Sequence, residues 1–123
     1  MTNFNIKQQN FTKDDVPTRL HHLATNLSEI KSLFISNSHQ ESVLELVKES
    51  RYFIEWVVPD MVPIDVEQAA EIVDLQRVLT RWLSSWEKIW YDATEKTKAI
   101  QQTEEWLLRV LEISQMQSHS IIA

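Results

Sequence analysis

The chain has 123 residues, a formal net charge of −6, and neither glycine nor cysteine. The acidic balance disfavours general nucleic-acid binding, because a negative field repels phosphate backbones, and the lack of cysteine excludes disulfides and thiolate metal sites. Tight hairpin turns and phosphate-cradling loops depend on glycine, so its absence predicts an all-α fold.

The N-terminal part is expected to be an arm followed by a long helix. Residues 1–13 are rich in Asn, Gln and Lys and predict a flexible arm. A helix should begin near Asp14 or Asp15, because either carboxylate can accept hydrogen bonds from free N–H groups and Pro17 is tolerated in a first turn. An apolar stripe at alternating spacings of four and three marks its buried face. The stripe consists of Val16, Leu20, Leu23, Leu27, Ile30 and Phe34.

A second helix is expected over residues 41–58. The residue before a proline avoids the helical conformation, so Pro59 and Pro63 predict that this helix stops there. Asp65 should then cap a third helix, with Gln68 three residues later completing a capping box. The inner face of the second helix consists of Val43, Leu46, Val47, Phe53, Ile54 and Val57.

The third helix carries a wide apolar face that ends before Asp92. A break is expected there, because Asp92 with Glu95 repeats the capping-box pattern and a later stripe position, Thr103, is polar. A fourth helix is then expected over residues 93–115. The apolar face of the third helix consists of Ile72, Leu75, Leu79, Trp82, Leu83, Trp86, Ile89 and Trp90, and that of the fourth of Ile100, Leu107, Val110 and Leu111.

These elements predict an antiparallel up-down bundle of four helices over residues 14–116, with a flexible tail over residues 117–123. No proline or glycine interrupts residues 64–123. Three helices, of which the C-terminal one is long and bent, are therefore the alternative architecture. One helical domain is expected in both cases.

Carboxylates offer the main candidate for catalysis. Glu45 and Glu49 on the second helix, with Glu71 and Asp74 on the third, loosely resemble the acidic motifs with which all-α nucleoside triphosphate pyrophosphohydrolases hold Mg²⁺. The spacing on the second helix departs from the E-x-x-E of that family, and helical geometry turns Glu45 and Asp74 toward solvent. We therefore assign no catalytic, metal or cofactor residue and keep a Mg²⁺-dependent nucleotide hydrolase as the alternative function.

Aromatic residues beside the inner stripes predict a protein contact. Tyr52 and Trp56 lie one turn apart, and Trp106 with Val110 and Ile113 extends the apolar face of its helix. Exposed patches of this kind favour a protein interface. The expected function is that of a non-enzymatic protein that binds another protein, including a second copy of itself as a homodimer.

The three tryptophans of the third helix predict core packing, since large rings at this spacing fill a bundle. A small-molecule ligand or pigment held among Trp82, Trp86 and Trp90 stays open as a further alternative.

Three mostly apolar segments carry a family resemblance: Arg19-Leu20 with Leu23-Ala24-Thr25-Asn26-Leu27, Phe53-Ile54-Glu55-Trp56, and Trp86-Glu87-Lys88-Ile89-Trp90. Through them the chain resembles an uncharacterised family of small all-helical proteins from cyanobacteria. The resemblance implies a cyanobacterial cytoplasm and carries no activity or site. A cytoplasmic location without a membrane partner is also expected because no secretory signal is visible and no apolar run approaches the ~18 residues that span a bilayer.

Overall fold

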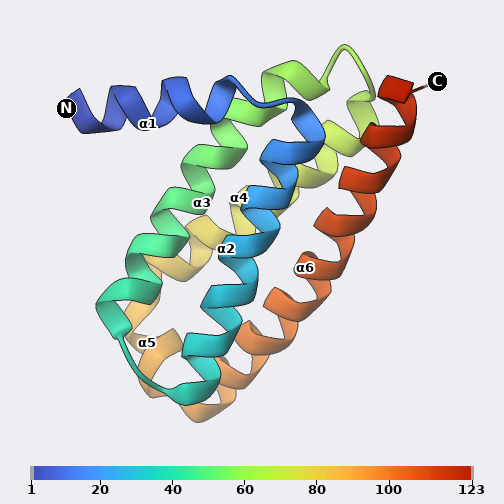
Figure 1. Ribbon diagram of the computed structural model, residues 1–123. Helices are drawn as coiled ribbons and strands as arrows, with labels where there is room; N and C mark the ends of the chain where they lie inside the picture. Colours follow the sequence, from blue (N-terminus) through green and yellow to red (C-terminus); the bar gives the residue numbers. More distant parts are fainter. Residues whose placement is uncertain (1, 123) are drawn as a thin grey trace.

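A computed structural model describes residues 2–122, with side chains over residues 4–118, and within that range every regular element is an α-helix. The all-α prediction is therefore confirmed. The helices are α1 (Thr2–Thr12), α2 (Val16–Ser36), α3 (Gln40–Met61), α4 (Val66–Ser84), α5 (Trp86–Tyr91) and α6 (Ala93–Ile122). The long helices α2, α3, α4 and α6 run up and down as a bundle, and α1 lies across one end (Figure 1).

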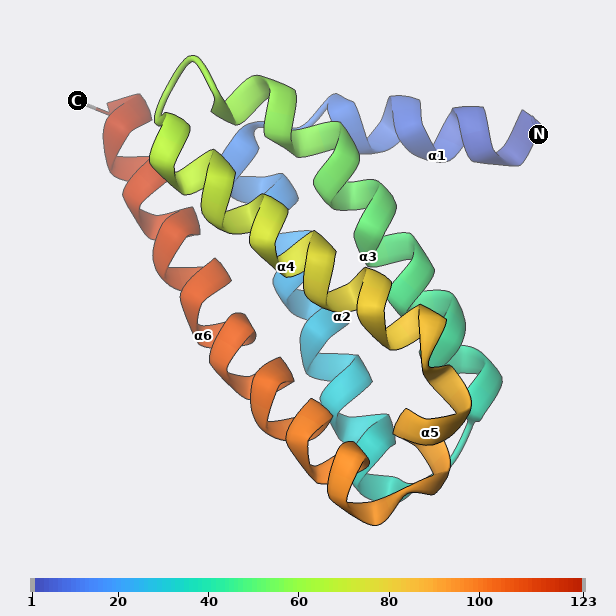
Figure 2. The same cartoon turned by 180° about the vertical axis from the view of Figure 1, so that it is seen from behind.

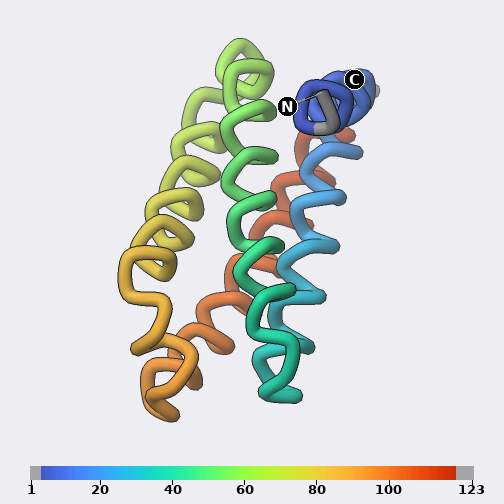
Figure 3. The backbone as a smooth tube through the Cα atoms, turned by 90° about the vertical axis from the view of Figure 1, so that its left-hand side faces the viewer, coloured from blue at the N-terminus to red at the C-terminus, as the bar shows by residue number. Residues whose placement is uncertain are grey.

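Helix α2 is the centre of the packing. It packs against both α3 and α6. Helix α4 packs against α3 and makes only a small contact with α6. From behind, α4 lies in front of α2, with α6 and α3 on its two sides (Figure 2). Figure 3 shows α1 end-on while the long helices run along the page, so α1 crosses the bundle and does not extend it.

Local sequence signals explain α2. The Asp15 carboxylate accepts a hydrogen bond from the Thr18 N–H at 2.9 Å, and Pro17 lies in the first turn. All six residues of the predicted stripe are buried. The helix ends where Asn37 takes a left-handed conformation (φ 53°), which asparagine tolerates better than most residues.

The prediction that the second helix stops at Pro59 is wrong, because α3 continues to Met61 with Pro59 in its last turns. Proline has no N–H, so α3 gives up one backbone hydrogen bond at Pro59 and continues for two more residues. Arg19 of α2 also holds the last turns of α3 in place. Its guanidinium donates to the Trp56 carbonyl at 3.3 Å and to the Asp60 carboxylate at 2.8 Å.

The predicted break near Asp92 is observed. The Asp92 carboxylate accepts hydrogen bonds from the N–H groups of Thr94 and Glu95, at 2.9 and 3.1 Å, where α6 begins. A second break at Ser85 separates α4 from α5 and was not expected. The turn at Ser85 redirects the chain, and Trp86 and Trp90 of α5 come to pack on Phe34 of α2.

The inner face of α6 differs from the expected one. Ile100, Leu107 and Leu111 are only partly buried, whereas Thr103, predicted to interrupt the apolar face, is fully buried. The Thr103 hydroxyl donates to the Ala99 carbonyl at 2.6 Å, so its polar group is satisfied inside its own helix. The face that α6 turns to the interior consists of Ala99, Thr103, Val110, Ile113 and Gln117.

The two ends of the chain are helical where the structure describes them. Residues 2–12, expected in an arm, form α1, and α6 continues through the segment expected as a tail to Ile122. Gln117 in that segment is 1 % exposed and donates to the side chain of Gln68 on α4 at 2.5 Å. Met1 and Ala123, the outermost residues of the two predicted flexible segments, lie outside the described residues.

A groove between α1 and α3 as the candidate interface

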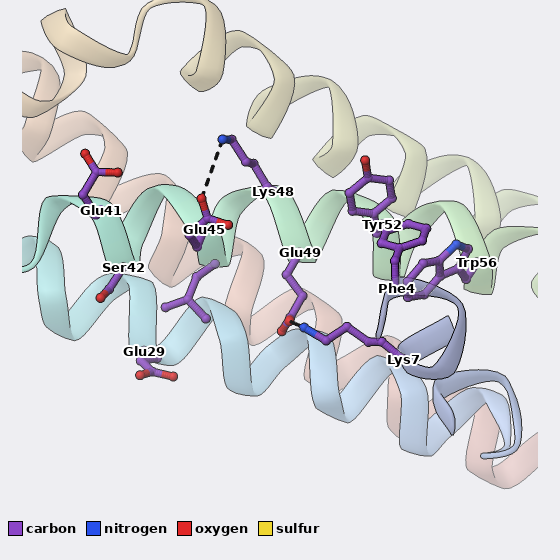
Figure 4. Close-up of a pocket in the computed structure, with 11 residues that line it drawn as sticks. Phe4, Lys7, Glu29, Glu41, Ser42, Glu45, Lys48, Glu49, Tyr52 and Trp56 are labelled. Carbon is purple, nitrogen blue, oxygen red and sulfur yellow. Dashed lines mark hydrogen bonds and ion pairs between the residues drawn. The ribbon is translucent and has the colours of Figure 1, made fainter. Parts of the chain in front are cut away.

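A groove of about 580 Å³ follows the outer face of α3, with α1 closing one end (Figure 4). Its lining separates into two chemically different parts. The aromatic end consists of Phe4 from α1 with Tyr52 and Trp56 from α3. The acidic end consists of Glu29 from α2 with Glu41, Glu45 and Glu49 from α3.

The aromatic end is a packed cluster with one side open to water. The Phe4 ring lies edge-on to Tyr52 and to Trp56, with centroids 4.7 and 5.4 Å apart, and Tyr52 stacks on Trp56 at 5.8 Å. These are favourable geometries for aromatic pairs. Phe4 remains 37 % exposed and Tyr52 42 % exposed. Two large rings of this cluster are therefore available to a partner.

A second layer of rings lies beneath this cluster. Phe11 of α1 is 6 % exposed and stacks on Phe53 at 4.3 Å, with Trp56 5.7 Å away. The guanidinium carbon of Arg19 lies 5.9 Å from the centre of the Phe11 ring, within the range of a cation–π contact. Phe4 and Phe11 thus attach α1 to the bundle through rings on the same side of the helix.

The acidic end carries more carboxylates than cations. Glu49 is paired with Lys7 of α1 and also accepts from the Asn26 amide at 3.1 Å, while Glu45 has only a loose ion pair with Lys48 at 3.7 Å. Glu29 and Glu41 make no ion pair or side-chain hydrogen bond with the part of the chain that the structure describes. Four carboxylates against two lysines leave the groove acidic.

The five predicted contact residues do not form one surface. Tyr52 and Trp56 lie together at the aromatic end, but Val110 and Ile113 are 0 % exposed and belong to the core, so their assignment to a contact surface is wrong. Their helix packs that face against α2, which the periodicity of one helix could not reveal. Trp106 is half-buried and lines a different hollow, together with arginines of α4.

The carboxylates of the hydrolase alternative lie in separate ion pairs. Glu71 accepts two hydrogen bonds from Arg109 of α6, at 2.6 and 2.7 Å, and Asp74 accepts one from Arg77 at 3.1 Å. Glu45 and Glu49 lie in the groove with the lysine partners given above. Among the described residues, no three acidic or histidine side chains are grouped so that they could hold a metal ion.

The Glu71–Arg109 pair predicts a small pH dependence of stability. The hydrogen bonds from Arg109 lower the pKa of Glu71 below its ordinary value of 4.5. A lowered folded-state pKa gives a contribution that is complete above the unfolded value and is lost as the pH falls through the folded one. Urea unfolding at pH 7 and pH 3 should show a cost of Glu71→Gln that shrinks at the lower pH. It should stay below about 1 kcal/mol, because the pair is partly exposed. An equal cost at both pH values would contradict this prediction.

The contribution of α1 to the groove was not predicted from the amino-acid sequence. Phe4, Lys7 and Phe11 follow one another at spacings of three and four, which is the signal of a helix face. The surrounding Asn and Gln residues made the segment look unstructured. The signal was therefore present, but three residues in a polar segment are a weak pattern.

Comparisons with protein-family models, with curated proteins and with solved structures find no match for this chain. The resemblance to a cyanobacterial family stays a prediction. Across the residues that the structure describes, none of the helices combines the length and the apolar character needed to cross a membrane. The α1–α3 groove combines exposed aromatic rings with carboxylates that lack a cation among the described residues.

Proposed function

We propose that this protein acts by binding another protein, and that the α1–α3 groove is its contact surface. The observation that carries the proposal is the presence of exposed aromatic rings and unpaired carboxylates in the same groove. Aromatic side chains are enriched at the centres of protein interfaces, where they supply large contact areas with few rotatable bonds. The chain would work as a binding module and not as a catalyst.

The lining of the groove indicates a basic partner segment with an aromatic or large aliphatic side chain. The apolar side chain would pack on Tyr52 and Trp56, and the cations would meet Glu41 and Glu29. Lys7 of the chain itself pairs with Glu49 in this groove, which supports lysine as one of the cations that a partner would place there. Complementary charge of this kind raises the association rate and selects against acidic partners.

Self-association, expected from the sequence, stays a prediction. In a two-fold symmetric dimer the same surface of each copy faces the other. A dimer that used this groove would place two acidic surfaces against each other, and like charges repel. We therefore favour a different, basic protein as the partner, and we propose the cytoplasm as the location, in agreement with a chain that has no cysteine.

The binding role is better supported than the nucleotide hydrolase. A Mg²⁺ site in a helical bundle needs several oxygen ligands around one point. Glu71 faces Arg109, and Asp74 is paired with Arg77 on its own helix, while Glu45 and Glu49 line a different surface. No specific observation favours the enzyme.

Selection from a displayed library of random peptides tests the proposed function without knowledge of the natural partner. We expect the selected peptides to be basic and to contain an aromatic or large aliphatic residue. They should bind the Glu41→Lys/Glu45→Lys variant at least about tenfold more weakly than the wild-type chain, because two attractive contacts become repulsive. Fluorescence anisotropy measures both dissociation constants.

The matched control is Glu87→Lys/Glu105→Lys, which changes the net charge by the same amount at exposed positions of α5 and α6 outside the groove. The control should bind the selected peptides like the wild type. If both double variants weaken peptide binding equally, the effect comes from net charge alone, and the groove is not the contact surface.

A further inference from the structure

We propose that α1 is an internal occupant of this groove, and that the natural partner supplies an amphipathic helix which takes the place of α1. This inference rests on the proposed function and specifies the partner segment. The segment would present an aromatic residue, a lysine three residues later and a second aromatic residue four residues after that, as α1 does.

The contacts of α1 define this pattern. Phe4 packs on Tyr52 and Trp56, and Phe11 stacks on Phe53. Lys7, between them in sequence, pairs with Glu49. Residues three and four apart lie on one face of a helix. A helix that seats such a face in a groove is a common mode of peptide recognition, in which anchors at these spacings determine which helices bind.

Helix α1 is held less firmly than the rest of the molecule. It has 11 residues, and a helix of this length is marginal in water without tertiary contacts. Of its described side chains at residues 4–12, Phe11 is buried, Gln8 is half-buried and the others are exposed. It packs mainly against α3, and three residues connect it to α2. Its release would leave the contacts among the long helices in place.

The surface beneath α1 is continuous on both of its sides. A second hollow of about 340 Å³ lies between α1, α2 and α3, and it shares Lys7 and Glu49 with the α1–α3 groove. Phe11 and Phe53 line this second hollow. Helix α1 therefore divides one surface of α2 and α3 into two hollows, as a bound helix would.

A partner helix can gain contacts that α1 does not make. Glu45 and Glu41 lie beyond Glu49 along α3, away from the aromatic end (Figure 4). A partner helix that lies across the bundle as α1 does, with long basic side chains on the side that faces the acidic end, would reach toward these carboxylates. A ligand shifts an equilibrium only by its differential affinity for the two states, and these contacts would supply that difference. The connection of α1 to α2 makes α1 an intramolecular competitor, which raises the apparent dissociation constant of the partner.

The test uses a fluorescent peptide of residues 2–15 as the probe and the full-length chain as the receptor. Phe4→Ala/Phe11→Ala weakens the internal helix and leaves Tyr52, Phe53 and Trp56 in the groove. This variant should bind the peptide at least about tenfold more tightly than the wild-type chain, because the groove is vacated. The control Asn5→Ala/Gln9→Ala changes exposed positions of α1 and should bind like the wild type.

A charge exchange tests the same geometry without removing any aromatic ring. The Glu49→Lys chain should prefer a Lys7→Glu peptide over the unmodified peptide by at least about tenfold, and the wild-type chain should show the opposite preference. Thermal unfolding followed by circular dichroism checks that the Glu49→Lys chain keeps its folded bundle of long helices. A purely structural role of α1 would not produce a preference that follows the charge of the peptide.

The remaining outcomes separate the two proposals. If the peptide binds all chains equally, or binds none of them, displacement of α1 is overturned. If the selected library peptides still bind more weakly to the Glu41→Lys/Glu45→Lys variant, the proposed function is retained. If the wild-type chain forms dimers that the α1 peptide dissociates, the groove belongs to a second copy of this chain, and the assignment to a different partner is overturned.

Discussion

Replacing Phe34 by alanine should lower the free energy of unfolding by about 3–5 kcal/mol, the range typical of a buried phenylalanine. Phe34 is 1 % exposed, and its ring centroid lies 5.9 to 6.1 Å from the rings of Trp82, Trp86 and Trp90. It joins α2 to α4 and to α5. Its removal would leave a cavity among large rings that cannot close without moving a helix. Urea unfolding followed by tryptophan fluorescence measures the loss.

The neighbouring residue provides the control for this prediction. Ile35 is 61 % exposed, and Ile35→Ala should change the unfolding free energy by less than about 0.5 kcal/mol. Equal losses at positions 34 and 35 would mean that the aromatic cluster does not stabilise the junction of α2, α4 and α5.

Replacing Arg19 by alanine should cost about 2–4 kcal/mol, although arginine is usually a surface residue. Arg19 is 4 % exposed and donates hydrogen bonds to the Trp56 carbonyl and to Asp60, and it also faces the Phe11 ring. One side chain thus connects α2 to the last turns of α3 and to α1. The alanine variant loses these bonds and leaves a cavity.

Arg19→Met separates volume from hydrogen bonding. Methionine fills much of the same space, and Asp60 is 58 % exposed, so its charge stays hydrated when the arginine is gone. We expect the methionine variant to lose less than half as much stability as the alanine variant in urea unfolding. Equal losses would show that the hydrogen bonds, and not the packed volume, dominate the contribution of Arg19.

The helix starts were the most predictable part of the fold. Asp15, Asp65 and Asp92 each accept hydrogen bonds from backbone N–H groups two or three residues later. Caps of this kind involve only neighbouring residues, so the sequence contains all the information that they need. Gln68 completes no capping box, because its side chain bonds to residues of α6.

Helix ends and α6 were less predictable, because distant residues decide them. Pro59 is accommodated near the end of a helix whose last turns are tied to Arg19, 40 residues earlier in the chain. Thr103 is buried because α6 packs closely on α2, and its hydroxyl is satisfied within the helix. Neither contact leaves a periodic pattern in the local sequence.

The candidate site was predictable in part. The exposed ring of Tyr52 beside Trp56 follows from the width of the apolar face of α3. The rest of the groove depends on α1, whose three anchors hold it across the bundle through contacts with α3. Val110 and Ile113 show the opposite case, since an apolar face that looks too wide for one neighbour can be covered completely by the bundle.

The amino-acid sequence by itself determined the helical class, the caps and the buried stripe of α2, because these depend on backbone chemistry and on spacing within one helix. Only the tertiary structure decided which helix faces are exposed to water, which carboxylates form ion pairs and where α1 lies. These properties arise from contacts between residues far apart in the chain, and a binding surface is what remains after those contacts are made.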